Sequence, residues 1–287
     1  MKAVNKQTFK QKMMAYKRKP LSLAMYLLVV IATVLTVGAL FFLIGYILVM
    51  GIPNIKPEMF SWEYNSENVS FMPAIVNTII MTALSLLIAA PLGIFSAIYL
   101  VEYAKRGNKF VGVIRTTAET LSGIPSIVYG LFGMLFFVTA LDWGYSLLSG
   151  SLTLAIMILP LIMRTTEEAL KTVPDSYREG SFGLGAGRLR TVFRVVLPSA
   201  IPGILAGVIL AIGRIVGETA ALIYTAGTVA ELPKDLMSSG RTLAVHMYAL
   251  SSEGLHTNEA YATAVILLVT VLLINTLSAF IAKKIAK

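Results

Sequence analysis

Residues 179–198 read EGSFGLGAGRLRTVFRVVLP, a polar, basic and glycine-containing segment that lies between two long apolar runs. The apolar runs cover residues 152–163 before it and residues 201–212 after it. Hydrocarbon cannot satisfy the backbone and charged groups of such a loop, so the loop must lie in water between two membrane spans.

The same segment carries signals for two short helices joined by a turn. Pro174 and Asp175 favour a helix start, because proline fits the first turn and a carboxylate lies well near the positive end of a helix. Glycines at positions 183, 185 and 187 interrupt the helix and allow a backbone with positive φ. A second helix is predicted from Arg188 towards Leu197, after which Pro198 is expected to bend the chain back into the bilayer.

The spacing of residues in this loop resembles the EAA loop of ABC transporter permeases. That pattern has an acid and two small residues, three free positions, a glycine, nine free positions and an aliphatic-x-Leu-Pro ending. The matching positions are Glu179, Gly180, Ser181, Gly185, Val195, Leu197 and Pro198. The family has Ala-Ala where this chain has Gly180 and Ser181. The resemblance implies an ABC importer type I permease fold and a loop that couples to a separate ATPase.

Composition independently predicts an all-α integral membrane protein. Apolar residues make up 56% of the 287 residues and charged residues only 14%. About six transmembrane helices, each of roughly 20 apolar residues, are expected. They are placed at residues 21–50, 71–103, 124–141, 151–164, 199–224 and 260–282. A further amphipathic outer helix is expected within residues 232–250.

These spans divide the chain into three parts. Residues 1–20 are a basic arm, residues 21–70 hold the first transmembrane helix and an outer loop, and residues 71–284 form the permease core. The coupling loop at residues 174–198 belongs to that core.

The distribution of charge predicts how the chain is oriented. Lysine and arginine cluster before the first span, at residues 105–109, at residues 171–194 and at residues 283–287. The positive-inside rule then places both termini and the coupling loop in the cytoplasm. The expected location is the bacterial inner membrane. The net charge of +9 follows from this topology, so no nucleic-acid partner is expected.

Sequence motifs for bound cofactors are missing. No G-x-x-x-x-G-K-[ST] motif occurs, so ATP is expected to be bound by a partner and not by this chain. The chain has no cysteine, and its two histidines are not at ligand spacing, so no metal site is expected.

Charged residues within the spans are the candidate translocation residues, because intramembrane charges are costly and by default suggest function. Arg214 lies in the fifth span and Glu218 follows four residues later, which would place both on one helix face. Arg164 lies near the inner end of the fourth span. Arg115 and Glu119 also have i, i+4 spacing, but beside an inner loop, where a solvated pair is expected.

These charged segments, together with GIPSIVYGLFG at residues 123–133, resemble the PstA-type permease of the Pst phosphate-uptake system. The resemblance covers most of the chain from about Asn77 onward, and it adds Ser126 to the candidate translocation residues. It implies four partners besides the lipid bilayer: a homologous PstC-like permease, two copies of a PstB-like ATPase and an extracytoplasmic PstS-like phosphate-binding protein.

The chemistry of arginine agrees with an anionic substrate, since a guanidinium offers a fixed fork of donors that matches phosphate oxygens. Glu218 has two candidate roles: it neutralises the empty Arg214, or it accepts the proton that phosphate carries and sulfate lacks. A purely structural Arg214–Glu218 pair is the alternative. Arg164 and Arg214 could form one site or two successive stations. Rival functions are a permease for sulfate, molybdate or phosphonate, a passive anion channel, and a membrane-embedded transferase.

Overall fold

The computed structural model describes residues 20–105 and 107–285, and the basic arm predicted at residues 1–20 lies almost entirely outside them. The described residues form helices and connecting loops, without a strand. The chain divides into two compact units, residues 1–50 and 51–287. The described part of the first unit is helix α2 (Pro20–Gly51), whose last residue begins the second unit and whose run of apolar residues is interrupted by no charge.

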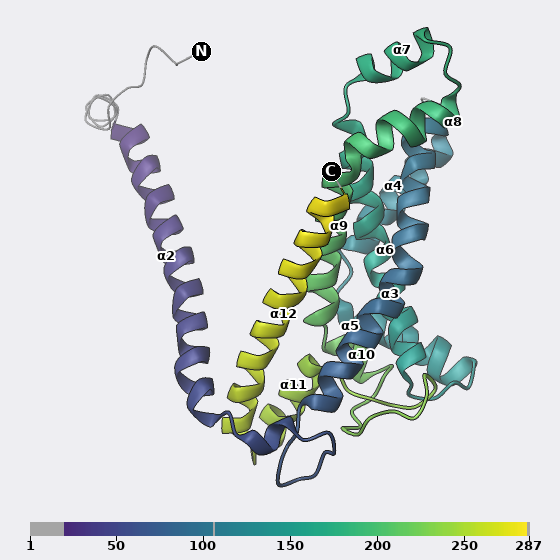
Figure 1. Cartoon of the computed structure of the whole chain (residues 1–287). Coiled ribbons are helices and arrows are strands. Elements are labelled where there is room, and N and C mark those ends of the chain that lie inside the picture. Colours follow the sequence, from purple (N-terminus) through teal and green to yellow (C-terminus); the bar gives the residue numbers. More distant parts are fainter. Residues whose placement is uncertain (1–19, 106, 286–287) are drawn as a thin grey trace. The chain divides into compact units, whose positions relative to one another are not determined.

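The second unit is a helical bundle, with α7 at one end and α11 at the other (Figure 1). Its elements in chain order are η1 (Ile52–Asn54), η2 (Pro57–Phe60), α3 (Met72–Ile98), η3 (Tyr99–Tyr103), α4 (Lys109–Ser122), α5 (Ser126–Gly133), η4 (Met134–Ala140), α6 (Leu147–Lys171), α7 (Asp175–Gly183), α8 (Arg188–Thr191), η5 (Val192–Val196), α9 (Leu197–Val216), α10 (Ala220–Ile223), α11 (Leu243–Glu253) and α12 (Thr257–Ile285).

The predicted all-α membrane architecture is confirmed. Among the described residues, five helices are long and apolar enough to cross a membrane, and a bent helix pair raises the number to six. Four predicted spans correspond to α2, α3 with η3, α6 and α12, with boundaries shifted by a few residues, or by up to seven at the ends of α6.

The third span differs from its prediction at residues 124–141. It is a pair of helical segments, Lys109–Ser122 and Ser126–Ala140, bent by 101° at the break. Pro125 explains the break, since it lacks an N–H and disfavours a helical conformation at the residue before it. Mean hydropathy did not identify α4 as part of a span, because polar residues occupy one of its faces. Arg115 on that face pairs with Glu167 at 2.7 Å, and not with Glu119 as its spacing suggested.

The fifth span also differs. Its helix begins earlier than predicted and runs without a break from Arg188 to Val216, with Pro198 inside it. The π-helical turn η5 (Val192–Val196) lies immediately before Pro198. At the other end, α9 stops at Val216 and not at residue 224, and Gly217 caps it. The outer helix predicted within residues 232–250 is shorter and later, at Leu243–Glu253.

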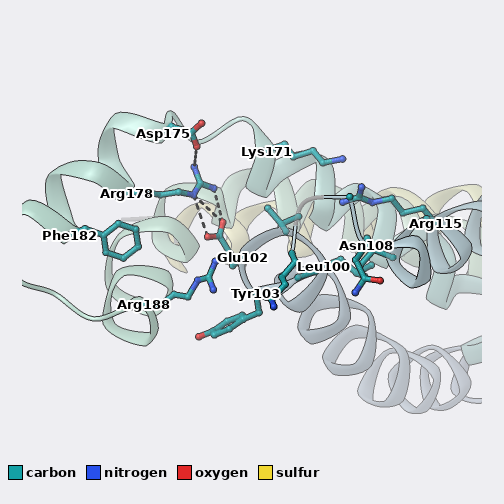
Figure 2. Close-up of a pocket in the computed structure, with 16 residues that line it drawn as sticks. Leu100, Glu102, Tyr103, Asn108, Arg115, Lys171, Asp175, Arg178, Phe182 and Arg188 are labelled. Carbon is teal, nitrogen blue, oxygen red and sulfur yellow. Dashed lines mark hydrogen bonds and ion pairs between the residues drawn. The ribbon is translucent and has the colours of Figure 1, made fainter.

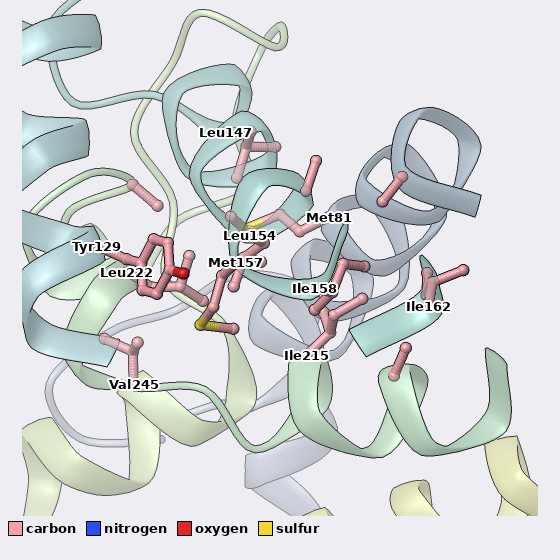
Figure 3. Close-up of a cluster of buried hydrophobic side chains, with 14 residues drawn as sticks. Met81, Tyr129, Leu147, Leu154, Met157, Ile158, Ile162, Ile215, Leu222 and Val245 are labelled. Atoms are coloured by element: carbon pink, nitrogen blue, oxygen red, sulfur yellow. The ribbon is translucent and has the colours of Figure 1, made fainter. Parts of the chain in front are cut away.

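Helices α3, α6 and α9 form the centre of the bundle. Their buried side chains include Met81, Leu154, Ile158, Ile162 and Ile215 (Figure 3). Small residues let the helices approach closely: a Cβ on Gly93 of α3 would lie 2.9 Å from a side-chain carbon of Ile162 on α6. This packed centre holds α6 and α9 in fixed register, and both helices carry candidate functional arginines.

Candidate functional site

Arg214 is half-buried in the last turn of α9. It lines a cavity of about 570 Å³ whose other walls are mostly apolar side chains of α6 and α9. Within the described part of the chain, its guanidinium makes no ion pair or hydrogen bond. Tyr129 is close enough to interact with it electrostatically. A cation held in apolar surroundings without a partner is costly, and it is therefore available to an anion.

Asn275 of α12 is the other polar residue in the wall of this cavity, and sequence reasoning missed it. Its side-chain oxygen is buried and has no hydrogen-bond partner among the described residues. An asparagine in an otherwise apolar span is a weak signal that could have identified it, since polar groups within the membrane are expensive.

Glu218 does not pair with Arg214. Because α9 ends at Val216, the two residues do not share a helix face, and the prediction of an i, i+4 pair is wrong. The Glu218 side chain is buried, and its carboxylate accepts a hydrogen bond of 3.1 Å from the backbone N–H of Ala221. Glu218 thereby closes the turn that starts α10, a few residues from Arg214.

Arg164 lies apart from Arg214. It is exposed on α6 and pairs with Glu168, one turn along the same helix, at 3.3 Å. It lines a small cavity beside α4, whereas Leu161 of the same helix lines the Arg214 cavity. Three residues of helix separate Leu161 and Arg164, or about 4.5 Å along the axis. The two arginines thus line neighbouring cavities at different heights, an arrangement suited to successive stations and not to one clamp.

Ser126 is the first residue of α5, at the bend after α4, and it is half-buried. The structure does not bring its side chain into the Arg214 cavity. Tyr129, one turn further along α5, is the nearer group, and its hydroxyl donates a hydrogen bond of 2.8 Å to the carbonyl of Leu121. That bond joins α5 to the end of α4 across the bend.

The coupling loop has the predicted short helix α7 and the predicted helix start at Arg188, joined by a glycine turn, but the second helix is not short, because α8 continues through η5 into α9. Gly185 has a φ of +81°, so the turn requires its conformational freedom. Gly183 ends α7 and Gly187 caps α8, both without a positive φ. Ser181 Oγ hydrogen-bonds Thr191 Oγ1 at 2.8 Å, which ties α7 to α8. This bond gives a physical reason for serine at a position where alanine is typical.

The remaining members of the loop pattern are accessible. Glu179 and Gly180 are exposed on α7, which buries none of its residues, and Pro198 is exposed where α9 begins, beside the half-buried Leu197. Large apolar side chains are exposed on the same loop, namely Tyr177, Phe182, Leu184, Leu189 and Phe193. An exposed apolar surface of this size on a short, charged loop is typical of a docking site for another protein.

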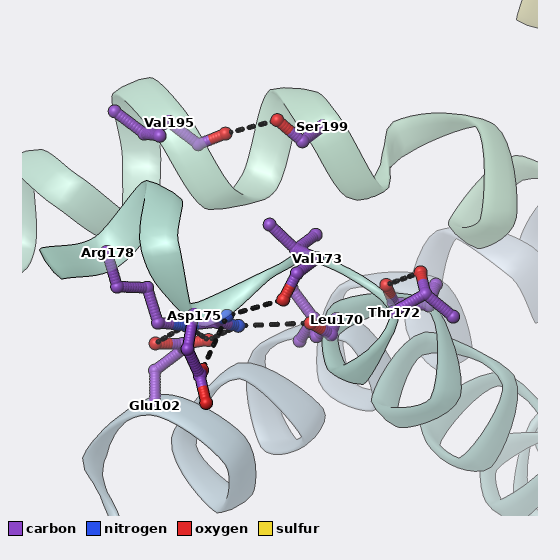
Figure 4. A network of polar contacts seen from close by, with 9 residues as sticks. Glu102, Leu170, Thr172, Val173, Asp175, Arg178, Val195 and Ser199 are labelled. Atoms are coloured by element: carbon purple, nitrogen blue, oxygen red, sulfur yellow. Dashed lines mark hydrogen bonds and ion pairs between the residues drawn. The ribbon is translucent and has the colours of Figure 1, made fainter. Parts of the chain in front are cut away.

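Arg178 of α7 forms the most extensive polar contacts of the loop (Figure 4). Its Nη2 lies 2.7 Å from Glu102 Oε1, and its Nε lies 3.2 and 3.3 Å from the two carboxylate oxygens. The same guanidinium donates to the carbonyls of Val173 and Leu170 at 2.7 and 3.0 Å. The hydrogen bonds and charge of Glu102 raise the pKa of Arg178. Sequence reasoning missed this pair, because 76 residues separate its members.

A cavity of about 800 Å³ lies beside this contact, between the loop and the segment that joins α3 to α4 (Figure 2). Basic side chains line it, among them Lys105, Arg115, Lys171 and Arg188. The Arg188 guanidinium lies over the Tyr103 ring, 5.5 Å from its centre. The bundle end that carries α7 is therefore strongly basic.

Comparison with known proteins places the chain in a family. The model of the family described as "Binding-protein-dependent transport system inner membrane component" matches residues 89–287. The chain belongs to this family. It is thus a membrane permease subunit, a transport component of an ABC importer.

Two of its relatives are permeases of similar length. The probable ABC transporter permease protein YqgI of Bacillus subtilis is 36% identical over 251 residues, which are 81% of this chain and 85% of the relative. The phosphate transport system permease protein PstA 1 of Mycobacterium tuberculosis is 33% identical over 211 residues, 72% of this chain and 69% of the relative.

Solved structures agree in fold. A chain of a bacterial ABC transporter that imports the acidic polysaccharide alginate superposes with a TM-score of 0.68, covering 96% of this chain and all of the other, at 19% identity. A chain of the MetNI methionine ABC transporter superposes with a TM-score of 0.58, covering 76% of this chain and 94% of the MetNI chain. The predicted type I importer permease fold is confirmed.

Proposed function

We propose that this permease carries inorganic phosphate into the bacterial cytoplasm as part of an ATP-driven importer. The observation that carries the proposal is Arg214, a half-buried cation without an ion-pair partner in the described part of the chain, which lines a mostly apolar cavity. A guanidinium keeps its charge under all ordinary conditions and presents a fork of donors to the oxygens of an oxyanion. The PstA relatives support phosphate as that oxyanion.

We propose that Glu218 recognises the proton that phosphate carries, by accepting a hydrogen bond from it. Glu218 follows Arg214 by four residues, and its carboxylate accepts one hydrogen bond, from the backbone N–H of Ala221 in α10, so we propose that its remaining acceptor capacity serves a hydroxyl of HPO₄²⁻ or H₂PO₄⁻. Sulfate has no proton to donate at neutral pH. Arg164 is the next site for the anion, because on α6 it lies one turn closer to the coupling loop than Leu161, which lines the Arg214 cavity. Ser126 lies beside the proposed path, at the bend between α4 and α5.

In this proposal the coupling loop receives the movement that ATP binding and hydrolysis cause in the ATPase. The helices α7 and α8 with the turn between them keep their shape through the residues of the loop pattern, namely Glu179, Gly180, Ser181, Gly185, Leu197 and Pro198. The exposed aromatic and leucine side chains of this loop enter a groove of a separate ATPase. Two ATPase copies, a homologous second permease and an extracytoplasmic phosphate-binding protein complete the importer. The basic end of the bundle with α7 faces the cytoplasm, together with both termini.

Reconstitution tests the substrate. The importer, purified with its partner subunits, is placed in proteoliposomes with its phosphate-loaded binding protein, and uptake of labelled phosphate and labelled sulfate is measured with and without ATP. We expect phosphate uptake that needs ATP and that excess sulfate does not compete away. Equal uptake of both anions would contradict selectivity for phosphate, and sulfate uptake without phosphate uptake would assign the permease to another oxyanion.

A single variant separates the two roles considered for Glu218. If Glu218 reads the proton of phosphate, Glu218→Gln loses selectivity, and excess sulfate then inhibits phosphate uptake. If the carboxylate acts only by its charge, Glu218→Gln changes the rate of uptake and leaves the selectivity intact.

A further inference from the structure

Helix α7 is weakly attached to the bundle by packing. It buries none of its residues, and its N- and C-terminal connections are short loops. Ser181 ties it through Thr191 to the helix that continues into the fifth span. The polar contacts of α7 with the ends of α3 and α6 are made by a different side chain, that of Arg178.

Arg178 connects three elements at once. Its donors reach both carboxylate oxygens of Glu102, in the π-helical turn that continues α3. They also reach the carbonyl of Leu170 in the last turn of α6 and that of Val173, two residues beyond its end. In Figure 4 the guanidinium lies between these groups, with Glu102 on one side and the end of α6 on the other.

The contact is protected from water. Side chains of Arg178 and Glu102 are only 15% and 8% exposed, whereas Asp175, which also contacts the guanidinium, is 71% exposed. A shielded, forked ion pair with several hydrogen bonds has one preferred geometry, and removing one partner leaves a buried charge uncompensated. A solvated pair would flex and transmit little force.

We propose that the Arg178–Glu102 ion pair is the joint through which movement of α7 is passed to α3 and α6. This inference rests on the proposed coupling of α7 to an ATPase. Helices α3 and α6 pack along each other through the centre of the bundle, and α6 carries Arg164 and lines the Arg214 cavity. A displacement of α7 thereby reaches the anion path through rigid elements. Arg178 and Glu102 are positioning residues, since neither contacts the substrate.

The first test measures coupling in the reconstituted importer, with inorganic phosphate as the substrate. Glu102→Gln keeps the shape of the side chain and removes its charge. We expect normal assembly and basal ATP hydrolysis, but at least a fivefold lower ratio of phosphate imported to ATP hydrolysed. Arg178→Lys keeps the charge, loses the fork, and should give an intermediate ratio. If Glu102→Gln fails to assemble, the ratio measured for Arg178→Lys decides the test.

Asp175→Asn is the matched control, because it removes the exposed partner of the same guanidinium and leaves the buried one. Its ratio should equal that of the unmodified importer. A normal ratio in both Glu102→Gln and Arg178→Lys would overturn the proposal. Failure of the unmodified importer to couple ATP to phosphate would instead overturn the proposed function, so the two failures are distinguishable.

A second test measures the distance between α7 and α3 directly. This chain has no cysteine, so spin labels can be attached at two introduced cysteines without background from it. Ser176 on α7 and Phe95 on α3 are exposed positions for the labels. The distance between the labels should stay narrow and unchanged when ATP is bound, because α7 and α3 move together. In Glu102→Gln the distance should broaden or shift with ATP. Identical distributions in the two proteins would contradict a mechanical role.

Discussion

Arg214 and Glu102–Arg178 show two ways in which a charged residue is tolerated in or near the membrane. Arg214 lies in an apolar cavity without a counter-ion in the described residues. Arg178 is fully engaged with a carboxylate and with helix-end carbonyls. The engaged arginine stabilises one geometry, whereas the unengaged one is free to take a ligand. Sequence identified Arg214 by its position in an apolar run, but the distant partner of Arg178 leaves no local signal.

Removing the charge of Arg214 should abolish transport. Arg214→Gln removes the fixed cation that offsets the cost of bringing a multiply charged anion into the bilayer, so we expect no measurable phosphate uptake and normal assembly with partner subunits. Arg214→Lys should restore uptake only in part, since an ammonium keeps the charge and loses the fork. The measurement is initial uptake of labelled phosphate at matched expression. Uptake by Arg214→Gln at the unmodified rate would reduce Arg214 to a structural residue.

The glycine turn of the coupling loop makes a second prediction at this scale. Gly185→Val should lower ATP-driven uptake, because a β-branched residue at φ of +81° costs about 1–3 kcal/mol and distorts the turn. The space around Gly185 is open, so the effect comes from the backbone and not from a clash. Gly183→Ala is the control: its surroundings are equally open, it lies in α7 without a positive φ, and alanine favours a helix. Normal uptake by Gly185→Val would remove the turn from the coupling mechanism.

Among the elements, α11 buries a histidine outside the membrane spans. His246 is fully buried, its ring lies edge-on to Tyr64, and Arg241 stacks on the same tyrosine. Burial, together with the charge of Arg241, lowers the pKa of His246 to about 3. The folded protein therefore keeps this imidazole neutral at every physiological pH.

That burial predicts acid sensitivity of the α11 region. With a pKa lowered from 6.5 in the unfolded chain to about 3 in the folded one, the unfolded state binds the proton more readily. The stabilising contribution is complete above pH 6.5 and declines as the pH falls from 6.5 towards 3. Thermal unfolding of the purified importer between pH 7.5 and 4.5 measures it. His246→Gln should unfold at a lower temperature at pH 7.5, and this deficit should shrink at pH 4.5. His256→Gln, at the partly exposed neighbour, is the control, and an equal deficit of His246→Gln at both pH values would contradict the argument.

Elements also show where prediction from sequence succeeded and where it could not. Long apolar runs predicted α2, α3, α6 and α12, because their composition leaves no other structure possible in a bilayer. Helix α4 escaped because one face is polar, with Arg115 directed at Glu167 on α6. The start of the fifth span was placed too late because charged residues within 188–194 lower its hydropathy, although the helix already begins at Arg188. Both helices carry charged residues that lower mean hydropathy, so apolar runs alone do not record them.

At the scale of the whole molecule, the bent pair α4–α5 decides how many times the chain crosses the membrane. Arg115 of α4 contacts Glu167, near the end of α6 that carries the coupling loop. Gly133, at the end of α5, lies against Thr153, in the opposite half of α6. Fourteen residues of helix separate these two positions, or about 21 Å along the axis. The pair therefore advances through most of the hydrocarbon core, which is roughly 30 Å thick, and does not turn back.

Six crossings predict that both termini lie on the same side of the membrane, the cytoplasmic one by the distribution of lysine and arginine. Reporter fusions before Met1, after Lys287 and at Met237 measure this. Met237 lies in the long segment between α10 and α11, so its reporter should be extracytoplasmic and the two terminal reporters cytoplasmic. A re-entrant α4–α5 pair would leave five crossings and put the termini on opposite sides. The reporter before Met1 is therefore decisive, since the single crossing of α12 puts the reporters at Met237 and after Lys287 on opposite sides for either count.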